Sequence, residues 1–301
     1  MPTQSEINAM IYFHYYPNLP LAVVSLVIYL LLSAALLVRV YTTNSRKFLY
    51  ILGCTGLLES VGYIFRIVSA KNSTLGSYIG MSLLLLLPPN ALALVNYKST
   101  GEMIRLSGVP PSRFFLKPKF VTWFFFSSDV FAFLLQGSGG GLQAMGGEKA
   151  NLGKTITLIG LTVQLFFFAS FAFITMHVHR SPKYQYSVVG QTNPKRNLSI
   201  CLYITLILLY IRSIYRIAEY AGGFDGPIAS AEWAFYVFDT LIIAIAFVVY
   251  YFIFIGNYLP KRNEEGQTKA TRVFSSSSSE DINHIERGGD PEGIRLYQVK
   301  K

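Results

Sequence analysis

The sequence predicts an all-α integral membrane protein, a bundle of seven transmembrane helices with the N-terminus outside and the C-terminus in the cytosol. Three observations predict this fold class. Of the 301 residues, 52% are hydrophobic and only 14% are charged, which is unlike a soluble domain of this length. Apolar runs long enough to cross a bilayer recur along the chain. Basic residues collect in alternate connections between these runs.

Seven apolar runs are each long enough for a spanning helix, which needs about 20 apolar residues to cross a hydrocarbon layer about 30 Å thick. None of them alternates polar and apolar residues as a half-buried strand would. We therefore divide the chain into a short extracellular segment, 1–18, a membrane domain, 19–256, and a tail, 257–301. The predicted spans lie near 19–39, 48–68, 75–97, 120–142, 153–177, 198–220 and 233–256.

The orientation follows from lysine and arginine, because short cytosolic loops collect these residues. Three lie in the first connection, five in the third, four in the fifth and eight in the tail, whereas the opposite connections hold only Lys71, Lys149 and Lys154. The N-terminus is therefore expected outside. The formal charge of +10 is then a topology signal with an affinity for anionic lipid on the cytosolic side, and a nucleic-acid partner is excluded.

Two kinds of modification site follow from this orientation. Asn72 begins an Asn-Ser-Thr acceptor for N-glycosylation on the outer side. The tail is poor in apolar residues, and we expect it to be disordered and cytosolic. It either holds a regulatory segment phosphorylated on serine or has no role beyond topology, two interpretations that the sequence leaves balanced. The candidate phosphorylation sites are Ser275, Ser276, Ser277, Ser278 and Ser279.

Polar side chains inside the predicted spans recur at a spacing of seven residues. Seven residues is close to two helical turns, so both members of a pair lie on one helix face. A charge at the centre of a bilayer costs at least about 2.5–3.5 kcal/mol on insertion scales, so each pair is expected to face a partner or a wet cavity. The pairs are Glu59 and Arg66, Asp129 and Gln136, Arg212 and Glu219, and Glu232 and Asp239, with Arg216 one turn after Arg212.

These polar stripes predict an outward-opening cavity large enough for an amphiphile. At about 1.5 Å of rise per residue, Glu59 and Asp129 lie near the middle of the membrane and form the cavity floor. The alternative is a set of buried ion pairs that fix the helix register. Four acids and Glu232 outnumber the three arginines, so we expect at least one carboxyl group, with Asp129 the strongest candidate, to be protonated or to be paired only with bound ligand.

Helix-breaking residues add a second signal. Pro88 and Pro89 remove two backbone donors and predict a kink in the third span. The carbonyl groups that they free must be buried or line a cavity. Two glycine pairs favour close helix packing over hinge motion, and these are Gly76 with Gly80 and Gly137 with Gly141.

Other chemistries are poorly supported. The chain has no Gly-x-x-x-x-Gly-Lys-Ser/Thr run, which argues against direct use of ATP. Only His177 and His179 of the four histidines lie near a span, so a zinc-dependent intramembrane hydrolase is not supported. We therefore expect no enzyme activity, no catalytic residue, no metal and no cofactor.

The polar stripes form an ordered series of motifs. In chain order these are Glu59-x-x-Gly62-Tyr63-x-x-Arg66, Pro88-Pro89 with Tyr97, Asp129 with Gln136 and Gly139-Gly140, Gly160 with Gln164, Arg212-x-x-x-Arg216-x-x-Glu219, and Glu232-x-x-x-Tyr236-x-x-Asp239. The series resembles the fungal RTA-like family of lipid-translocating exporters over roughly residues 20–256. Two positions depart from that family at the cytosolic rim, where Gly101-Glu102 replaces Gly-Arg and Leu259-Pro260 replaces His-Pro.

The resemblance implies export or flip of sphingoid long-chain bases, resistance to toxic sterol-like compounds and, in some members, porphyrin movement. We therefore expect a plasma-membrane translocator of membrane lipids or amphiphilic small molecules, with no ATP hydrolysis of its own. The arginines would attract anionic head-group parts and the carboxylates would hold a cationic amine. The alternative is a seven-span lipid-sensing receptor or a stress-response membrane protein. Translocation is favoured because the chain lacks an acidic-Arg-Tyr motif in the third span and an Asn-Pro-x-x-Tyr motif in the seventh.

Overall fold

The computed structural model describes Met10, Phe13, Tyr15 and residues 17–109, 117–188, 190–222 and 226–260. Seven helical segments in this part are long and apolar enough to cross a membrane, which confirms the predicted fold class of an integral membrane protein. Each predicted span lies within one of them. The segments are Leu19–Thr42, Lys47–Lys71, Leu75–Ser107, Pro118–Ala144, Lys149–Arg180, Pro194–Ala221 and Glu232–Asn257. The candidate phosphorylation sites Ser275 to Ser279 lie outside the described residues, whereas Asn72 is exposed at the end of the second span.

The last spanning segment is divided into several elements, and the second segment begins with a short 3-10 turn. In chain order the elements are α2 (Leu19–Thr42), η1 (Lys47–Leu49), α3 (Tyr50–Lys71), α4 (Leu75–Ser107), α5 (Pro118–Ala144), α6 (Glu148–Arg180), α7 (Pro194–Ala221), α8 (Glu232–Phe235), the π-helix η3 (Tyr236–Leu241), α9 (Ile242–Phe252) and η4 (Ile255–Asn257).

Local sequence explains where these helices begin and end. Asn18 caps α2 by accepting a hydrogen bond from the backbone of Leu21 at 3.2 Å. Thr74 and Ser77 form a capping box at the start of α4. Helix α4 runs ten residues beyond the predicted span and ends at Gly108, which has a φ of 70°. The polar residues of this extension, 98–107, end the apolar run, so the prediction stopped before them. The extension is nevertheless helical, because about half of its side chains are buried against the bundle.

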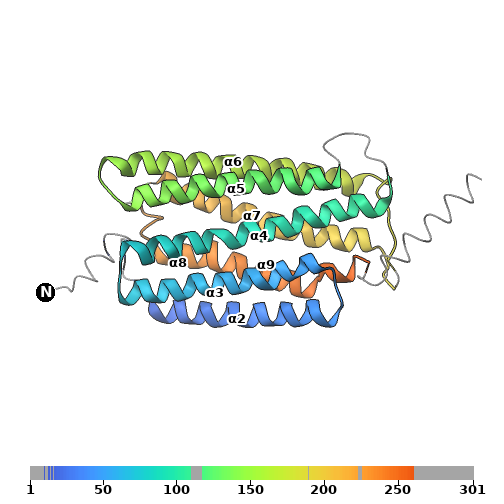
Figure 1. Cartoon of the computed structure of the whole chain (residues 1–301), viewed down its shortest axis with the longest axis horizontal. Coiled ribbons are helices and arrows are strands. Elements are labelled where there is room, and N and C mark those ends of the chain that lie inside the picture. The colour runs from blue at the N-terminus through green and yellow to red at the C-terminus, as the bar shows by residue number, and fades with distance from the viewer. Residues whose placement is uncertain are drawn as a thin grey trace, which may run out of the picture. The chain divides into compact units, whose positions relative to one another are not determined.

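The helices pack as a closed ring in chain order. Each helix from α2 to α6 packs against the next one in the chain, so that α6 meets α7. Helix α7 then packs against α9, and α9 packs against α2. Helices α4 and α7 also make contact with each other. Figure 1 shows both of them running between the α5–α6 pair and the α2–α3 pair. Side chains from α4 and α7 therefore supply much of the interior.

Glycine allows α5 and α6 to approach closely. A Cβ atom on Gly153 would lie 2.5 Å from the carbonyl oxygen of Gly139 and 2.6 Å from the backbone nitrogen of Gln143. The expectation of two close-packed glycine pairs was partly wrong, because a Cβ atom on Gly76 or Gly141 would meet nothing within 4 Å. The spacing of glycines along one helix cannot show which of its faces meets a neighbouring helix. In α5 the face that contains Gly139 packs against α6.

Candidate functional site

Asp239 joins two arginines of α7 inside the bundle. Its Oδ2 atom lies 2.5 Å from Nη2 of Arg216, and its Oδ1 atom forms an ion pair with Nε of Arg212. Arg216 also contacts Oε2 of Glu219 at 3.0 Å. Asp239 lies in η3, where the π-helical turn changes the direction of its side chain relative to a regular α-helix. The two predicted stripes of α7 and of the last span therefore meet.

Arg66 forms the second centre of the site. Its Nη2 atom donates to Glu232 at 3.0 Å and to the Tyr15 hydroxyl at 3.1 Å, and its Nε atom donates to the Tyr236 hydroxyl at 3.1 Å. The guanidinium group also lies 4.3 Å from the centre of the Phe235 ring. Tyr15 was not predicted to belong to the site. Burial raises the pKa of its phenol above the ordinary value, and the neighbouring charge of Arg66 opposes that rise.

Glu59 is the one carboxylate here without a direct partner. It is 3% exposed and makes no hydrogen bond or ion pair with any described residue. Its charged neighbours are Asp239, Arg212 and Arg216. We call the whole group the ionic cluster, and it consists of Glu59, Arg66, Arg212, Arg216, Glu219, Glu232 and Asp239. The ionic cluster holds one more carboxyl group than arginine, and Glu59 is the one left over.

Tyr63 lies one turn from Glu59 and ties α3 to the last span. Its hydroxyl group is 2.5 Å from Oγ1 of Thr240 in η3. Its ring stacks on that of Tyr29, whose hydroxyl donates to the Thr240 carbonyl at 2.6 Å. Both tyrosines therefore fix η3 beside Glu59.

The double proline of α4 is connected to the ionic cluster. Pro89 has no backbone N–H, so the carbonyl group of Leu85 loses its usual helical donor. Nη2 of Arg212 donates to that carbonyl at 3.2 Å. Helix α4 continues through Pro88 and Pro89. The freed carbonyl is thus buried and satisfied by a charged side chain from the opposite helix.

A double-mutant cycle tests this connection. In the Pro89→Ala variant the new backbone N–H can bond to Leu85, so Arg212→Met is expected to destabilise that variant by about 1 kcal/mol less than it destabilises the wild type. Thermal denaturation of the purified proteins in detergent measures the difference. Pro88→Ala is the control, because it restores a donor to Leu84 instead and should show no coupling. Equal coupling for both prolines would contradict the assignment.

Asp129 belongs to a separate polar group. It is fully buried in α5 and accepts a hydrogen bond from the Tyr97 hydroxyl at 2.7 Å. Its Oδ1 atom has no hydrogen-bond partner among the described residues. The rings of Phe125 and Phe171 pack around Tyr97. No described hydrogen bond or ion pair joins Asp129 to the ionic cluster, and neither Asp129 nor Glu59, the expected cavity floor, is among the residues that line the cavity beside that cluster.

Gln136 also lies apart from the ionic cluster. Its Nε2 atom donates to Gln164 at 2.8 Å, and Gln164 donates to Asn90 at 2.6 Å. Asn90 directly follows the two prolines. These three amides link α4, α5 and α6 in a second buried network.

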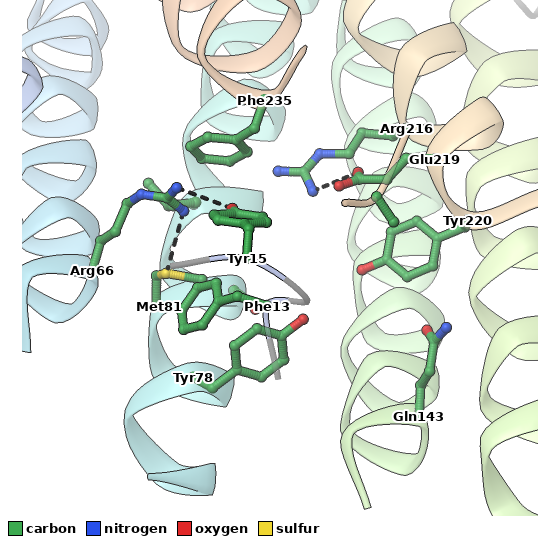
Figure 2. A pocket seen from close by; sticks show the side chains of 13 residues that line it. Phe13, Tyr15, Arg66, Tyr78, Met81, Gln143, Arg216, Glu219, Tyr220 and Phe235 are labelled. Carbon is green, nitrogen blue, oxygen red and sulfur yellow. Dashed lines mark hydrogen bonds and ion pairs between the residues drawn. The ribbon is translucent and has the colours of Figure 1, made fainter. Parts of the chain in front are cut away.

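A cavity of about 80 Å³ lies beside the ionic cluster and is lined by Arg66, Arg216 and Glu219. Figure 2 shows the two arginines on opposite sides of it, with Tyr15 between them. A smaller cavity of about 20 Å³ shares Tyr78, Ser82, Gln143 and Tyr220 with the first. The cavity that the described residues line beside the ionic cluster is therefore smaller than the expected amphiphile-sized one, since pockets for drug-sized ligands are about 300–1,000 Å³.

Aromatic side chains explain the small size of the cavity. Phe13 and Tyr15 come from the segment that was expected to lie outside the membrane domain, yet both line the cavity with Phe235. Phe13 packs edge-on against Tyr78, with ring centroids 5.1 Å apart. The aromatic residues just before the first span are the sequence signal that could have predicted their place in the cavity wall. Within the described ranges, no three His, Cys, Asp or Glu side chains gather closely enough to hold a metal ion.

Glu102 lies at the end of the bundle opposite the ionic cluster, where the sequence has Gly101-Glu102 instead of the expected Gly-Arg. It forms ion pairs with Arg46 at 2.5 Å and with Arg105 at 2.8 Å. Arg46 precedes η1, whereas Glu102 and Arg105 lie in the last turns of α4. The acid in place of the expected arginine thus joins the α2–α3 connection to α4.

The fold and the ionic cluster define a seven-span membrane protein with a charged interior. The model of the family described as RTA1 like protein matches residues 50–262, and the chain belongs to this family. It is 37% identical over 205 residues to protoporphyrin uptake protein 1 of Saccharomyces cerevisiae, covering 65% of each chain. It is 30% identical over 236 residues to Protein RTA1 of the same yeast, covering 77% of this chain and 73% of the relative.

A third relative is a sphingoid long-chain base transporter, RSB1, of Saccharomyces cerevisiae. The identity is 25% over 234 residues, covering 65% of this chain and 60% of the relative. The chain thus spans less than two thirds of the length of this relative and of the porphyrin uptake protein. No solved structure matches the chain.

Proposed function

We propose that this protein moves amphiphilic lipids across the membrane without hydrolysing ATP itself. Membership of the RTA1-like family supports membrane transport, and the names of two relatives give a sphingoid long-chain base and a porphyrin as their substrates. We propose a cationic amphiphile such as a sphingoid base as the substrate of this chain. Toxic sterol-like compounds and porphyrins are further candidates. We place the protein in the plasma membrane with its N-terminus outside.

The observation that carries this proposal is the unpartnered carboxylate of Glu59. A buried charge is costly unless it is paired, and the three arginines of the ionic cluster already bind Asp239, Glu219 and Glu232. The ammonium group of a long-chain base supplies the missing positive charge. The ionic cluster then acts as the head-group site, with Tyr63 and Tyr236 as its hydrogen-bonding walls.

Asp129 and the Gln136–Gln164–Asn90 network are proposed as a second polar station for the head group. Both are buried, and Asp129 retains an oxygen atom without a described donor. A volume of about 80 Å³ does not accommodate a long aliphatic chain. Binding of an amphiphile therefore requires the rings of Tyr15 and Phe235 to move away from the cavity.

The test measures efflux of a labelled sphingoid base from cells that express wild type or variants at matched surface levels. Glu59→Gln keeps the shape of the side chain but removes its charge, and we expect it to reduce efflux by about 10- to 100-fold. Asp129→Asn is expected to reduce efflux as well. Glu102→Gln is the control, because it removes a carboxylate at the other end of the bundle. Wild-type efflux in both the Glu59 and Asp129 variants would refute the proposal.

A further inference from the structure

A groove of about 530 Å³ lies at the end of the bundle opposite the ionic cluster, between the last turns of α2 and the α9–η4 segment. In Figure 1 these two segments lie side by side at the right. Ala34, Ala35 and Val38 form the apolar part of the groove, and Arg39, Tyr251 and Asn257 form its polar end. No acidic residue lines it among the described residues, so its charge is positive.

Arg39 has unused hydrogen-bonding capacity. Its guanidinium group lies 4.7 Å from the centre of the Tyr251 ring and 5.4 Å from that of Phe254. It is half-buried, and no described residue accepts a hydrogen bond from its side chain or forms an ion pair with it. The amide group of Asn257 likewise has no described partner. The two aromatic rings thus hold a planar group of five N–H donors at the edge of the groove.

We propose that this groove binds an anionic phospholipid of the surrounding membrane. A guanidinium group matches the geometry of two phosphate oxygens, so Arg39 would hold the head-group phosphate and Asn257 would donate to it. The apolar residues of the groove favour a lipid over free phosphate as the ligand, because only a lipid has an acyl chain to pack against them. An acyl chain would run from Val38 towards Leu31 along the outer face of α2, where these residues are 61% and 65% exposed.

The position of the groove suits this ligand. Lys47 and Lys98 lie at the same end of the bundle, where the predicted topology places the cytosolic leaflet and its anionic lipids. This inference does not depend on the proposed translocation, because the groove shares no lining residue with the cavity beside the ionic cluster.

The experiment uses the full-length protein purified in detergent and counts bound phosphatidylserine and phosphatidylcholine by native mass spectrometry. We expect wild type to retain phosphatidylserine preferentially. Arg39→Gln should weaken phosphatidylserine binding about tenfold and leave phosphatidylcholine unchanged. Arg39→Lys keeps the charge, so its phosphatidylserine binding should lie between that of wild type and that of Arg39→Gln. Ala34→Phe should reduce the binding of both lipids, because the larger side chain occupies the path of the acyl chain.

Lys47→Gln is the matched control, since it removes one positive charge from an exposed residue at the same end but outside the groove. Its phosphatidylserine binding should stay within about twofold of wild type. Three results would overturn the proposal. These are equal losses for Lys47→Gln and Arg39→Gln, unchanged binding in both Arg39→Gln and Ala34→Phe, or full displacement of phosphatidylserine by inorganic phosphate. Because lipid retention is measured instead of efflux, failure here and failure of translocation are distinguishable.

Discussion

Asp239→Ala is expected to destabilise the protein by about 3–5 kcal/mol, the loss typical of removing one partner from a buried ion pair. Asp239 neutralises Arg212 and Arg216 at once, and both arginines are buried. After the substitution Arg216 keeps Glu219, but among the described residues Arg212 retains only the carbonyl group of Leu85 as a hydrogen-bond partner. The expected result is a large fall in the midpoint of thermal denaturation of the purified protein in detergent, or in the free energy of unfolding measured by steric trapping in bicelles.

Glu219→Gln provides the comparison for this experiment. It removes a carboxylate from the same cluster but leaves Arg216 paired with Asp239. Its destabilisation should be about 1 kcal/mol, since Gln can still accept a hydrogen bond from Arg216. Similar losses for the two variants would show that Asp239 has no special place in the ionic cluster.

Gly153→Ala is expected to destabilise the protein by about 1–3 kcal/mol through overpacking between α5 and α6. The added methyl group would lie 2.5 Å from a carbonyl oxygen and 2.6 Å from a backbone nitrogen of α5. Neither atom belongs to a side chain that can rotate away, so the two helices must separate. Thermal denaturation in detergent measures the loss, and separation of the helices would also disturb the Gln136–Gln164 hydrogen bond between them.

Gly76→Ala is the control for overpacking. Gly76 is also helical, but its added methyl group would meet nothing within 4 Å. Alanine favours helix over glycine by about 1 kcal/mol, so this variant should be as stable as wild type or slightly more stable. If Gly153→Ala behaved in the same way as Gly76→Ala, the close approach of α5 and α6 would be refuted.

The seven spans were predictable from the sequence because bilayer thickness sets a length that an apolar run must reach. The seven-residue spacing also identified which polar side chains share a helix face. Arg212 and Arg216 do meet Asp239, whereas Glu232, seven residues before Asp239, pairs with Arg66 instead. Local periodicity is sufficient for such statements because it depends only on helix geometry.

Contacts between helices were less predictable. Asp129 and Glu59 lie at similar estimated depths, but depth does not determine which neighbour a helix face meets, and the two acids belong to different polar groups. The π-helical turn around Asp239 has no simple sequence signature. The place of Tyr15 beside Arg66 also depends on how the chain folds back before α2. Each of these features is decided by tertiary packing.

Tyr15 competes with any ligand that binds Arg66 from the cavity. Its phenol occupies one of the donors of Arg66 beside the cavity, so a ligand that reaches this arginine from the cavity has to replace an aromatic ring of the same chain. The affinity measured for such a ligand is then the intrinsic affinity of the site reduced by the fraction of molecules in which the ring has withdrawn. Weak binding in solution would accordingly be compatible with a well-matched site.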